Sequence, residues 1–310
     1  MLTQEQLLHR LEPPKGPVDV VLDTDTFNEI DDQYALAYLV RSPEKLRLQA
    51  VYAAPFWNEK SSGPRDGMEK SYEEILRVLA LLGEEKRTQD VFRGSTEYLP
   101  DEKTPVDSPA ARDLVRRAMA RPADGEPLYV AAIGAITNVA SALLLEPAIA
   151  DRIVLVWLGG HAHDWPDTRE FNMYQDVAAA RVIFGCGVPV VQLPCMGVVS
   201  TFATTGPELE YWLRGKNALC DYLVDVTQAE AKRCGMGPCW SRVLWDVTTV
   251  AWLLGGFMKD RLTPAPIPQY DDHYSFDPTR PFIRYVYHIN RDRLMEDLFQ
   301  KLARTQREEE

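Results

Sequence analysis

The chain of 310 residues is long enough for one large domain or two smaller ones, and 45 % of its residues are hydrophobic, as in ordinary globular proteins. The formal net charge of −12 disfavours nucleic acid as a main partner, because few Lys and Arg side chains remain to neutralise phosphates. No secretory signal and no apolar stretch of the roughly 20 residues that span a membrane is recognisable. Five scattered cysteines are typical of reduced thiols. We therefore expect a cytoplasmic protein with neither a nucleic-acid nor a membrane partner.

Short apolar runs alternate with helical patterns over most of the chain. The predicted strands are residues 18–23, 46–53, 90–92, 128–133, 153–157 and 188–192. The predicted helices between them are residues 32–40, 68–82, 110–119, 138–145 and 176–184. The strands are continuous apolar runs, as in parallel sheets covered on both faces. This alternation predicts an α/β fold with an open, doubly wound, mostly parallel sheet and a Rossmann-like core.

The last third of the chain differs from this pattern and predicts a helical C-terminal elaboration. Residues 208–254 read as mostly helical, residues 262–278 as a Pro-rich surface loop, residues 282–288 as a strand and residues 291–303 as a helix. No linker splits the chain. We expect an N-terminal segment (residues 1–17), one domain (residues 18–304) and a frayed tail (residues 305–310).

The stretch "DTDTFNEIDD" after the first strand gathers four aspartates and one glutamate. One Asp there could cap the following helix, but four exceed what a cap needs. Carboxylates this close are tolerated when a hard cation such as Ca²⁺ or Mg²⁺ neutralises them. "DTDTF" also matches the nucleophile loop of haloacid-dehalogenase-type phosphatases, although Phe27 and the absence of convincing later motifs weigh against a Mg²⁺-dependent phosphatase.

Other unusual residues also follow predicted strands. The second strand leads to a polar loop with Trp57 and Asn58, the fourth leads to "GAITN", and the fifth leads to "LGGHAHDWPDTREFN". Ligands of open α/β sheets bind outside the carboxyl ends of the strands. The sequence therefore predicts that these segments form one pocket together with the acidic stretch.

Four motifs, taken in order, resemble those of the calcium-dependent nucleoside hydrolases (the inosine–uridine-preferring family and its relatives). "DTDTFNEIDDQYA" resembles the family's DxDPGxDDA with two extra residues, and "AAIGAITNVASALL" resembles its LGPLTNIA segment. "VLVWLGGHAHDWPDTREFN" is similar to its strand, glycine pair and EFN motif. "LWDVTTVAWLL" is similar to its late helix with an Asp ligand. The matches extend from residue 18 to about residue 254.

The resemblance implies a Ca²⁺ site formed by Asp25, Asp32, the backbone carbonyl of Thr137, and Asp246. It makes Asp25 the general base for a water molecule. Asp31 would accept hydrogen bonds from the ribose hydroxyls and share the role of base. Carbonyl and carboxylate oxygens are the ligands that Ca²⁺ prefers.

The resemblance also implies sugar contacts by Glu170 and Asn172 of the EFN motif. In an extended segment these two side chains would point to one side and Phe171 to the other. Asp164 stands where the family usually has an Asn near the 5′-hydroxyl, and two histidines could replace it, His161 or His163. Asn58, with Glu69, could provide the contact that the family places after its second strand.

Trp245 occupies the position at which the inosine–uridine-preferring enzymes have a histidine. A Trp cannot donate a proton at neutral pH, but the purine-specific relatives similarly place a Trp there and stack the base on it. A core role for Trp245 is equally consistent with its apolar helix. The possible second aromatic faces are Trp57, Tyr98 and Trp165.

We therefore expect hydrolysis of a nucleoside, with purine nucleosides favoured, to ribose and free base. The resemblance implies a homodimer or homotetramer. The alternative from another class is a non-catalytic Ca²⁺-dependent binder of nucleoside or ribose. The two extra residues in the loop of residues 26–30 stay unexplained, because Asn28 and Glu29 could enter the pocket or bulge outward.

Overall fold

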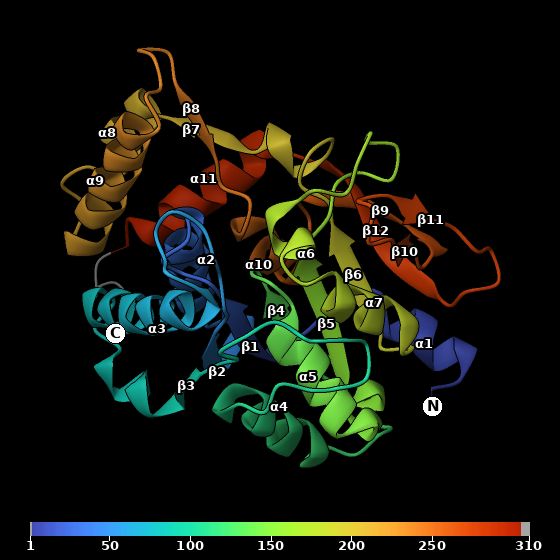
Figure 1. The fold of residues 1–310 in the computed structure, drawn as a ribbon. Coiled ribbons are helices and arrows are strands. Elements are labelled where there is room, and N and C mark those ends of the chain that lie inside the picture. Colours follow the sequence, from blue (N-terminus) through green and yellow to red (C-terminus); the bar gives the residue numbers. More distant parts are fainter. Residues whose placement is uncertain (1, 305–310) are drawn as a thin grey trace.

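The computed structural model describes residues 2–304 and is built around an eight-stranded sheet (Figure 1). The strand order is β3-β2-β1-β4-β5-β6-β12-β9, and all neighbours are parallel except β12 and β9. These strands are β1 (Val18–Thr24), β2 (Leu46–Ala53), β3 (Val91–Arg93), β4 (Leu128–Ala132), β5 (Ile153–Leu158), β6 (Val190–Leu193), β9 (Met258–Pro264) and β12 (Phe282–Ile289). Two small antiparallel sheets pair β7 (Ala203–Thr205) with β8 (Ser241–Val243) and β10 (Ile267–Pro268) with β11 (Tyr274–Ser275).

Helices cover both faces of the sheet, as the apolar strands require. One buried cluster packs against α2 (Asp31–Val40), α3 (Pro64–Leu81), α9 (Ala218–Arg233), α10 (Val247–Leu254) and α11 (Arg291–Leu302). The other packs against α4 (Pro109–Met119), α5 (Thr137–Leu145) and α7 (Val177–Gly185). The shorter helices are α1 (Gln4–Arg10), α6 (Phe171–Tyr174), α8 (Gly206–Trp212) and the 3₁₀ helices η1 (Glu85–Asp90), η2 (Pro147–Asp151) and η3 (Val199–Thr201). The predicted doubly wound, mostly parallel α/β fold is confirmed.

The predicted strands and helices of the first 200 residues are all present; the strand of residues 46–53 has the predicted ends, and the other elements have shifted ends. The largest shift concerns α3, which was predicted from residue 68 and begins at Pro64. Proline is favoured in the first turn of a helix because an N–H group at that position would have no partner within the helix.

The prediction for residues 208–278 was partly wrong. β8 interrupts the predicted helical region. β9 forms an edge of the central sheet, and its last three residues had been predicted as part of a loop. An edge strand keeps one side in solvent, so charged residues such as Lys259 and Arg261 are tolerated, and Pro264 is tolerated at its end. The rest of the predicted loop contains the β10–β11 hairpin.

The segment of residues 2–17 packs onto the domain. Its helix α1 begins with a capping box between Thr3 and Gln6. Arg10 donates from Nη2 to the carbonyl oxygen of Ala123 at 2.7 Å. The predicted frayed tail lies outside the described residues. Among residues 2–304, no helix has the length and apolar character needed to cross a membrane.

The order of the sheet reverses at β1, since β2 and β3 lie on one side and β4, β5 and β6 on the other. Ligands of such sheets bind outside the carboxyl ends of the strands at this switch point. Ile133 N–H donates to the carbonyl oxygen of Asp23, and Ala54 N–H donates to that of Thr24, each at 2.8 Å. The segments that follow β1, β2 and β4 therefore lie together.

Candidate active site

Asp25 directly follows β1 at the switch point, and only 1 % of its surface is exposed. Gly134 follows β4, and a Cβ atom at this position would lie 3.3 Å from Asp25 Cγ and 3.0 Å from Ala54 Cβ. A glycine at position 134 thus allows the backbone after β4 to approach the carboxylate closely.

Four buried residues, Asp25, Asp31, Asp32 and Asp246, form what we call the aspartate cluster. Asp31 and Asp32 begin α2, and Asp246 immediately precedes α10, which packs against α2. One carboxylate oxygen from each of these three lies within 4.8 Å of the others. Asp25 lines the same cavity and raises the pKa of Asp246 by its charge. Neither α2 nor α10 has a side-chain cap, so these carboxylates do not serve as helix caps.

Burial raises the pKa of every carboxyl group in the aspartate cluster. The pKa of Asp31 rises to about 8, first through burial and then through the charges of Glu29 and Asp32. The pKa of Asp32 rises to about 7, mainly through burial, although a hydrogen bond from Thr24 Oγ1 opposes the rise. Such a cluster needs either bound protons or a cation to be stable.

Two oxygens of the aspartate cluster are buried without a hydrogen-bond partner among residues 2–304: Asp25 Oδ2 and Asp31 Oδ1. Buried carboxylate oxygens are normally paired, so two orphaned ones in a single cluster indicate a missing ligand. An all-oxygen set of carboxylates suits a hard divalent cation. The residues present therefore fit a Ca²⁺-type ion.

The aspartate cluster forms the floor of a cavity of about 240 Å³. The remaining residues that line this cavity are Asn28, Glu29, Ile133, Leu158, His161, Arg169, Glu170, Phe171, Asn172, Cys195, Met196 and Trp245. Carboxylates at the floor with aromatic and apolar groups on the walls suit a ligand that has a polyhydroxylated end and a flat end.

Glu170 and Asn172 both line the cavity, but the segment is not extended as predicted. Glu170 caps α6, and its carboxylate accepts from the backbone N–H groups of Gly160, Asn172 and Met173 at 2.8, 2.9 and 3.0 Å. The helical turn brings Phe171 to the cavity as well, which corrects the expectation that it faces away. Burial raises the pKa of Glu170 to about 7 despite these donors.

His161 lines the cavity, whereas Asp164 and His163 do not. Asp164 and His163 line a separate cavity with Arg261 and Tyr285. Met196 N–H donates to His161 Nδ1 at 3.3 Å, and burial lowers the pKa of the imidazole. The neutral ring therefore carries its proton on Nε2, which is left free to donate.

Three other residues that the sequence suggested for the site lie outside the cavity lining. Thr137 begins α5, and its hydroxyl donates to Asp176 Oδ2 at 2.6 Å. Asn58 donates to Asn28 Oδ1 at 2.6 Å and thus reaches the cavity only through Asn28. Glu69 binds Arg93 at the surface.

Trp245 lines the cavity, while none of the three residues considered for a second aromatic face does so. Trp57 is 59 % exposed, and Trp165 packs edge-on against His161 at 6.0 Å between ring centroids. Phe171 is instead the aromatic residue that lines the cavity together with Trp245. Sequence reasoning missed it because the EFN motif was treated as extended.

Three further residues that line the cavity were not predicted: Cys195, Met196 and Arg169. Cys195 and Met196 follow β6 at the same edge of the sheet, so the rule of strand ends could have identified them. Arg169 forms an ion pair with Asp272 at 3.0 Å. No sequence signal marks that pair.

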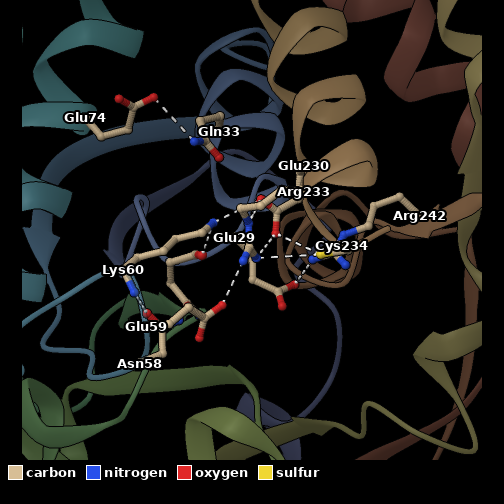
Figure 2. A network of polar contacts seen from close by, with 11 residues as sticks. Glu29, Gln33, Asn58, Glu59, Lys60, Glu74, Glu230, Arg233, Cys234 and Arg242 are labelled. Carbon is tan, nitrogen blue, oxygen red and sulfur yellow. Dashed lines mark hydrogen bonds and ion pairs between the residues drawn. The ribbon is translucent and has the colours of Figure 1, made fainter. Parts of the chain in front are cut away.

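Asn28 and Glu29 enter the cavity, which answers the question left by the longer loop. Phe27 instead is 37 % exposed. Figure 2 shows Glu29 within a polar network that also contains Asn58, Lys60 and Arg242. The extra residues therefore extend the wall of the site.

Known proteins resemble this chain in sequence and in fold. A family model described as inosine-uridine preferring nucleoside hydrolase matches residues 20–274. The pyrimidine-specific ribonucleoside hydrolase RihA of Enterobacter sp. (strain 638) is 27 % identical over 265 residues, which is 76 % of this chain and 78 % of that protein. The structure of an inosine-guanosine nucleoside hydrolase has a TM-score of 0.73 at 16 % identity, covering 93 % of this chain and 99 % of the other. The structure of a purine-preferring ribonucleoside hydrolase from Gardnerella vaginalis has a TM-score of 0.69 at 20 % identity, covering 92 % of this chain and 98 % of the other. These proteins share the fold but differ in the bases that their names specify.

Proposed function

The chain belongs to the inosine-uridine preferring nucleoside hydrolase family, a family of ribonucleoside N-glycosidases, and from this premise we propose that it hydrolyses a purine ribonucleoside to ribose and free base. The observation that carries the proposal is the aspartate cluster, with two orphaned buried oxygens beneath a cavity that Trp245 lines. A non-catalytic binder would have less need of so many buried carboxylates.

We propose Asp25, Asp32, Asp246 and the carbonyl of Thr137 as the residues that hold Ca²⁺. When bound, the ion would offset the carboxylate charges and make a water molecule easier to deprotonate. Asp32 and Asp246 support this assignment because their oxygens already converge with that of Asp31.

Asp25 is proposed as the general base, since Oδ2 has no donor within residues 2–304 and can accept the proton of the attacking water. Asp31 Oδ1 is likewise free to accept a hydrogen bond from a ribose hydroxyl. Cleavage of an N-glycosidic bond develops positive charge on the ribose ring. Fixed carboxylates beneath the ring stabilise that charge.

The remaining sugar contacts are proposed for Glu170, Asn172 and His161. Asn172 Nδ2 donates to the carbonyl oxygen of Leu158 at 3.1 Å, which leaves Oδ1 for a ribose hydroxyl. His161 Nε2–H is proposed to donate to the 5′-hydroxyl in place of Asp164. These groups are held by backbone contacts and so orient the sugar before reaction.

The leaving base is proposed to stack on Trp245, with Phe171 on the other wall. A purine covers more of an aromatic ring than a pyrimidine does, so purines gain more from such contacts. Trp245 has no proton to give at neutral pH. Stacking rather than acid catalysis by this side chain therefore assists departure of the base.

The test is release of reducing sugar from inosine, adenosine, guanosine and uridine by purified protein with Ca²⁺. We expect release from the purine nucleosides and a loss of at least about 100-fold in kcat for Asp25→Asn, as for removal of a general base. Asp124→Asn, at an exposed position, is the matched control. No release from any nucleoside, although nucleosides bind, would overturn the catalytic proposal in favour of a binder.

A further inference from the structure

The loop of residues 26–30, here called the acidic loop, is held by contacts from distant parts of the chain. Asn28 N–H donates to the carbonyl oxygen of Asp25 at 2.7 Å and closes a turn. Lys60 Nζ donates to the carbonyl oxygen of Asn28 at 2.7 Å, and Arg242 Nη2 donates to Glu29 Oε2 at 2.6 Å. The acidic loop is therefore a fixed wall of the cavity.

A chain of hydrogen bonds determines which way the Asn28 amide points. Lys60 N–H donates to Asn58 Oδ1 at 2.8 Å, so the amino group of Asn58 must lie on the other side. That amino group donates to Asn28 Oδ1 at 2.6 Å. Asn28 Nδ2 has no protein acceptor within residues 2–304 and is left as a donor in a residue that lines the cavity.

Glu29 supplies acceptors next to this donor. Arg242, whose side chain is 14 % exposed, uses one lone pair of Oε2 and fixes the position of the carboxylate. The Glu29 side chain is 40 % exposed, so Oε1 and the second lone pair of Oε2 stay accessible. Residues 28 and 29 thus present one donor and a pair of acceptors, and both residues line the cavity that Trp245 also lines.

We propose that Asn28 and Glu29 read the hydrogen-bonding edge of the base and select guanine, an inference that rests on the proposed function. The edge of guanine presents one acceptor, O6, followed by two donors, N1–H and the 2-amino group. Asn28 Nδ2 complements the acceptor, and the Glu29 carboxylate complements the two donors. Hypoxanthine lacks the 2-amino group, and adenine presents the acceptor N1 to the carboxylate. The expected order of kcat/KM is guanosine, then inosine, then adenosine.

The test is Glu29→Gln, which keeps the size of the side chain and replaces one acceptor by a donor. We expect kcat/KM for guanosine to fall about 10- to 100-fold, as for loss of a bidentate base contact. The value for adenosine should stay the same or rise, because the new amino group can donate to N1. Glu59→Gln is the matched control, since Glu59 belongs to the same network through Arg233 but does not line the cavity.

Calorimetry of guanosine and adenosine with Asp25→Asn protein measures base selection without hydrolysis, and does not depend on how well the Glu29 variant folds. Tighter binding of guanosine supports the proposal. Equal binding, or an equal loss of kcat/KM for both nucleosides in Glu29→Gln, overturns it. If the wild-type protein cleaves no nucleoside, the proposed function fails, and calorimetry still decides whether the loop selects guanine.

Discussion

The backbone N–H of Asp246 donates to Asp31 Oδ2 at 3.2 Å and joins two residues that are 215 positions apart. Asp31 begins α2 after the first strand, and Asp246 precedes α10 near the end of the domain. The aspartate cluster therefore forms only when α10 has packed against α2. A ligand that needs both segments binds the folded chain and not the unfolded one.

Calcium should accordingly stabilise the fold. At a free concentration of 100 Kd, binding to the folded state alone contributes about 2.7 kcal/mol. We expect Tm to rise by a few degrees between excess EGTA and saturating Ca²⁺, measured by calorimetry. Asp246→Asn should remove the response, whereas Asp124→Asn, at an exposed position, should retain it. The same Tm of the wild-type protein in both buffers would contradict a metal site.

Gly134→Ala should impair activity more than stability. The new Cβ would lie 3.0 Å from Ala54 Cβ and 3.3 Å from Asp25 Cγ, so the backbone and the carboxylate must both shift by a few tenths of an ångström. Because a general base acts only within hydrogen-bond reach, we expect kcat to fall about tenfold or more, while Tm falls by only a few degrees. Gly125→Ala is the control, because the atom nearest to the new Cβ is 3.4 Å away in Pro122. Its kcat and Tm should equal those of the wild-type protein. Unchanged kcat in Gly134→Ala would argue against Asp25 as the base.

The sequence predicts the centre of the fold well, because fully buried parallel strands are continuous apolar runs. β9 escaped detection because it is an edge strand whose exposed residues include charged ones, and it pairs with residues of β12 that are 18 to 31 positions away. Asp25, Asp31 and Asp32 were predictable from the end of the first strand, whereas Asp246 was predicted only from the resemblance of its helix to that of the family. The orientation of Asn28 was not, because it depends on Asn58 and Lys60 in a separate loop.

Glu230 should make the fold sensitive to acid. A hydrogen bond from Arg233 and the charge of Lys60 lower its pKa from 4.5 to about 2. A carboxyl group whose pKa is lower in the folded state stabilises the protein above pH 4.5, and this stabilisation is lost as the pH falls towards 2.

The corresponding measurement is Tm of the wild-type protein and Glu230→Gln between pH 7 and about pH 3. We expect the wild-type protein to have the higher Tm at neutral pH, and the difference to shrink below the ordinary pKa of a glutamate. Glu97→Gln, at an exposed position, should differ little from the wild type at any pH. A difference for Glu230→Gln that is constant with pH would contradict this interpretation.

His161 and His163 can be distinguished by a substrate that lacks the 5′-hydroxyl. His161 Nε2–H is free to donate into the cavity, whereas His163 Nε2 lies 3.0 Å from Gln192 Oε1 outside it. If His161 binds the 5′-hydroxyl, His161→Gln should lower kcat/KM about 2- to 10-fold for guanosine, the range of one neutral hydrogen bond. It should have no further effect on 5′-deoxyguanosine, because the hydroxyl is already missing. His163→Gln should leave the ratio of kcat/KM for guanosine to kcat/KM for 5′-deoxyguanosine unchanged. An equal loss for both substrates in His161→Gln would mean that this histidine supports the pocket and does not contact the hydroxyl.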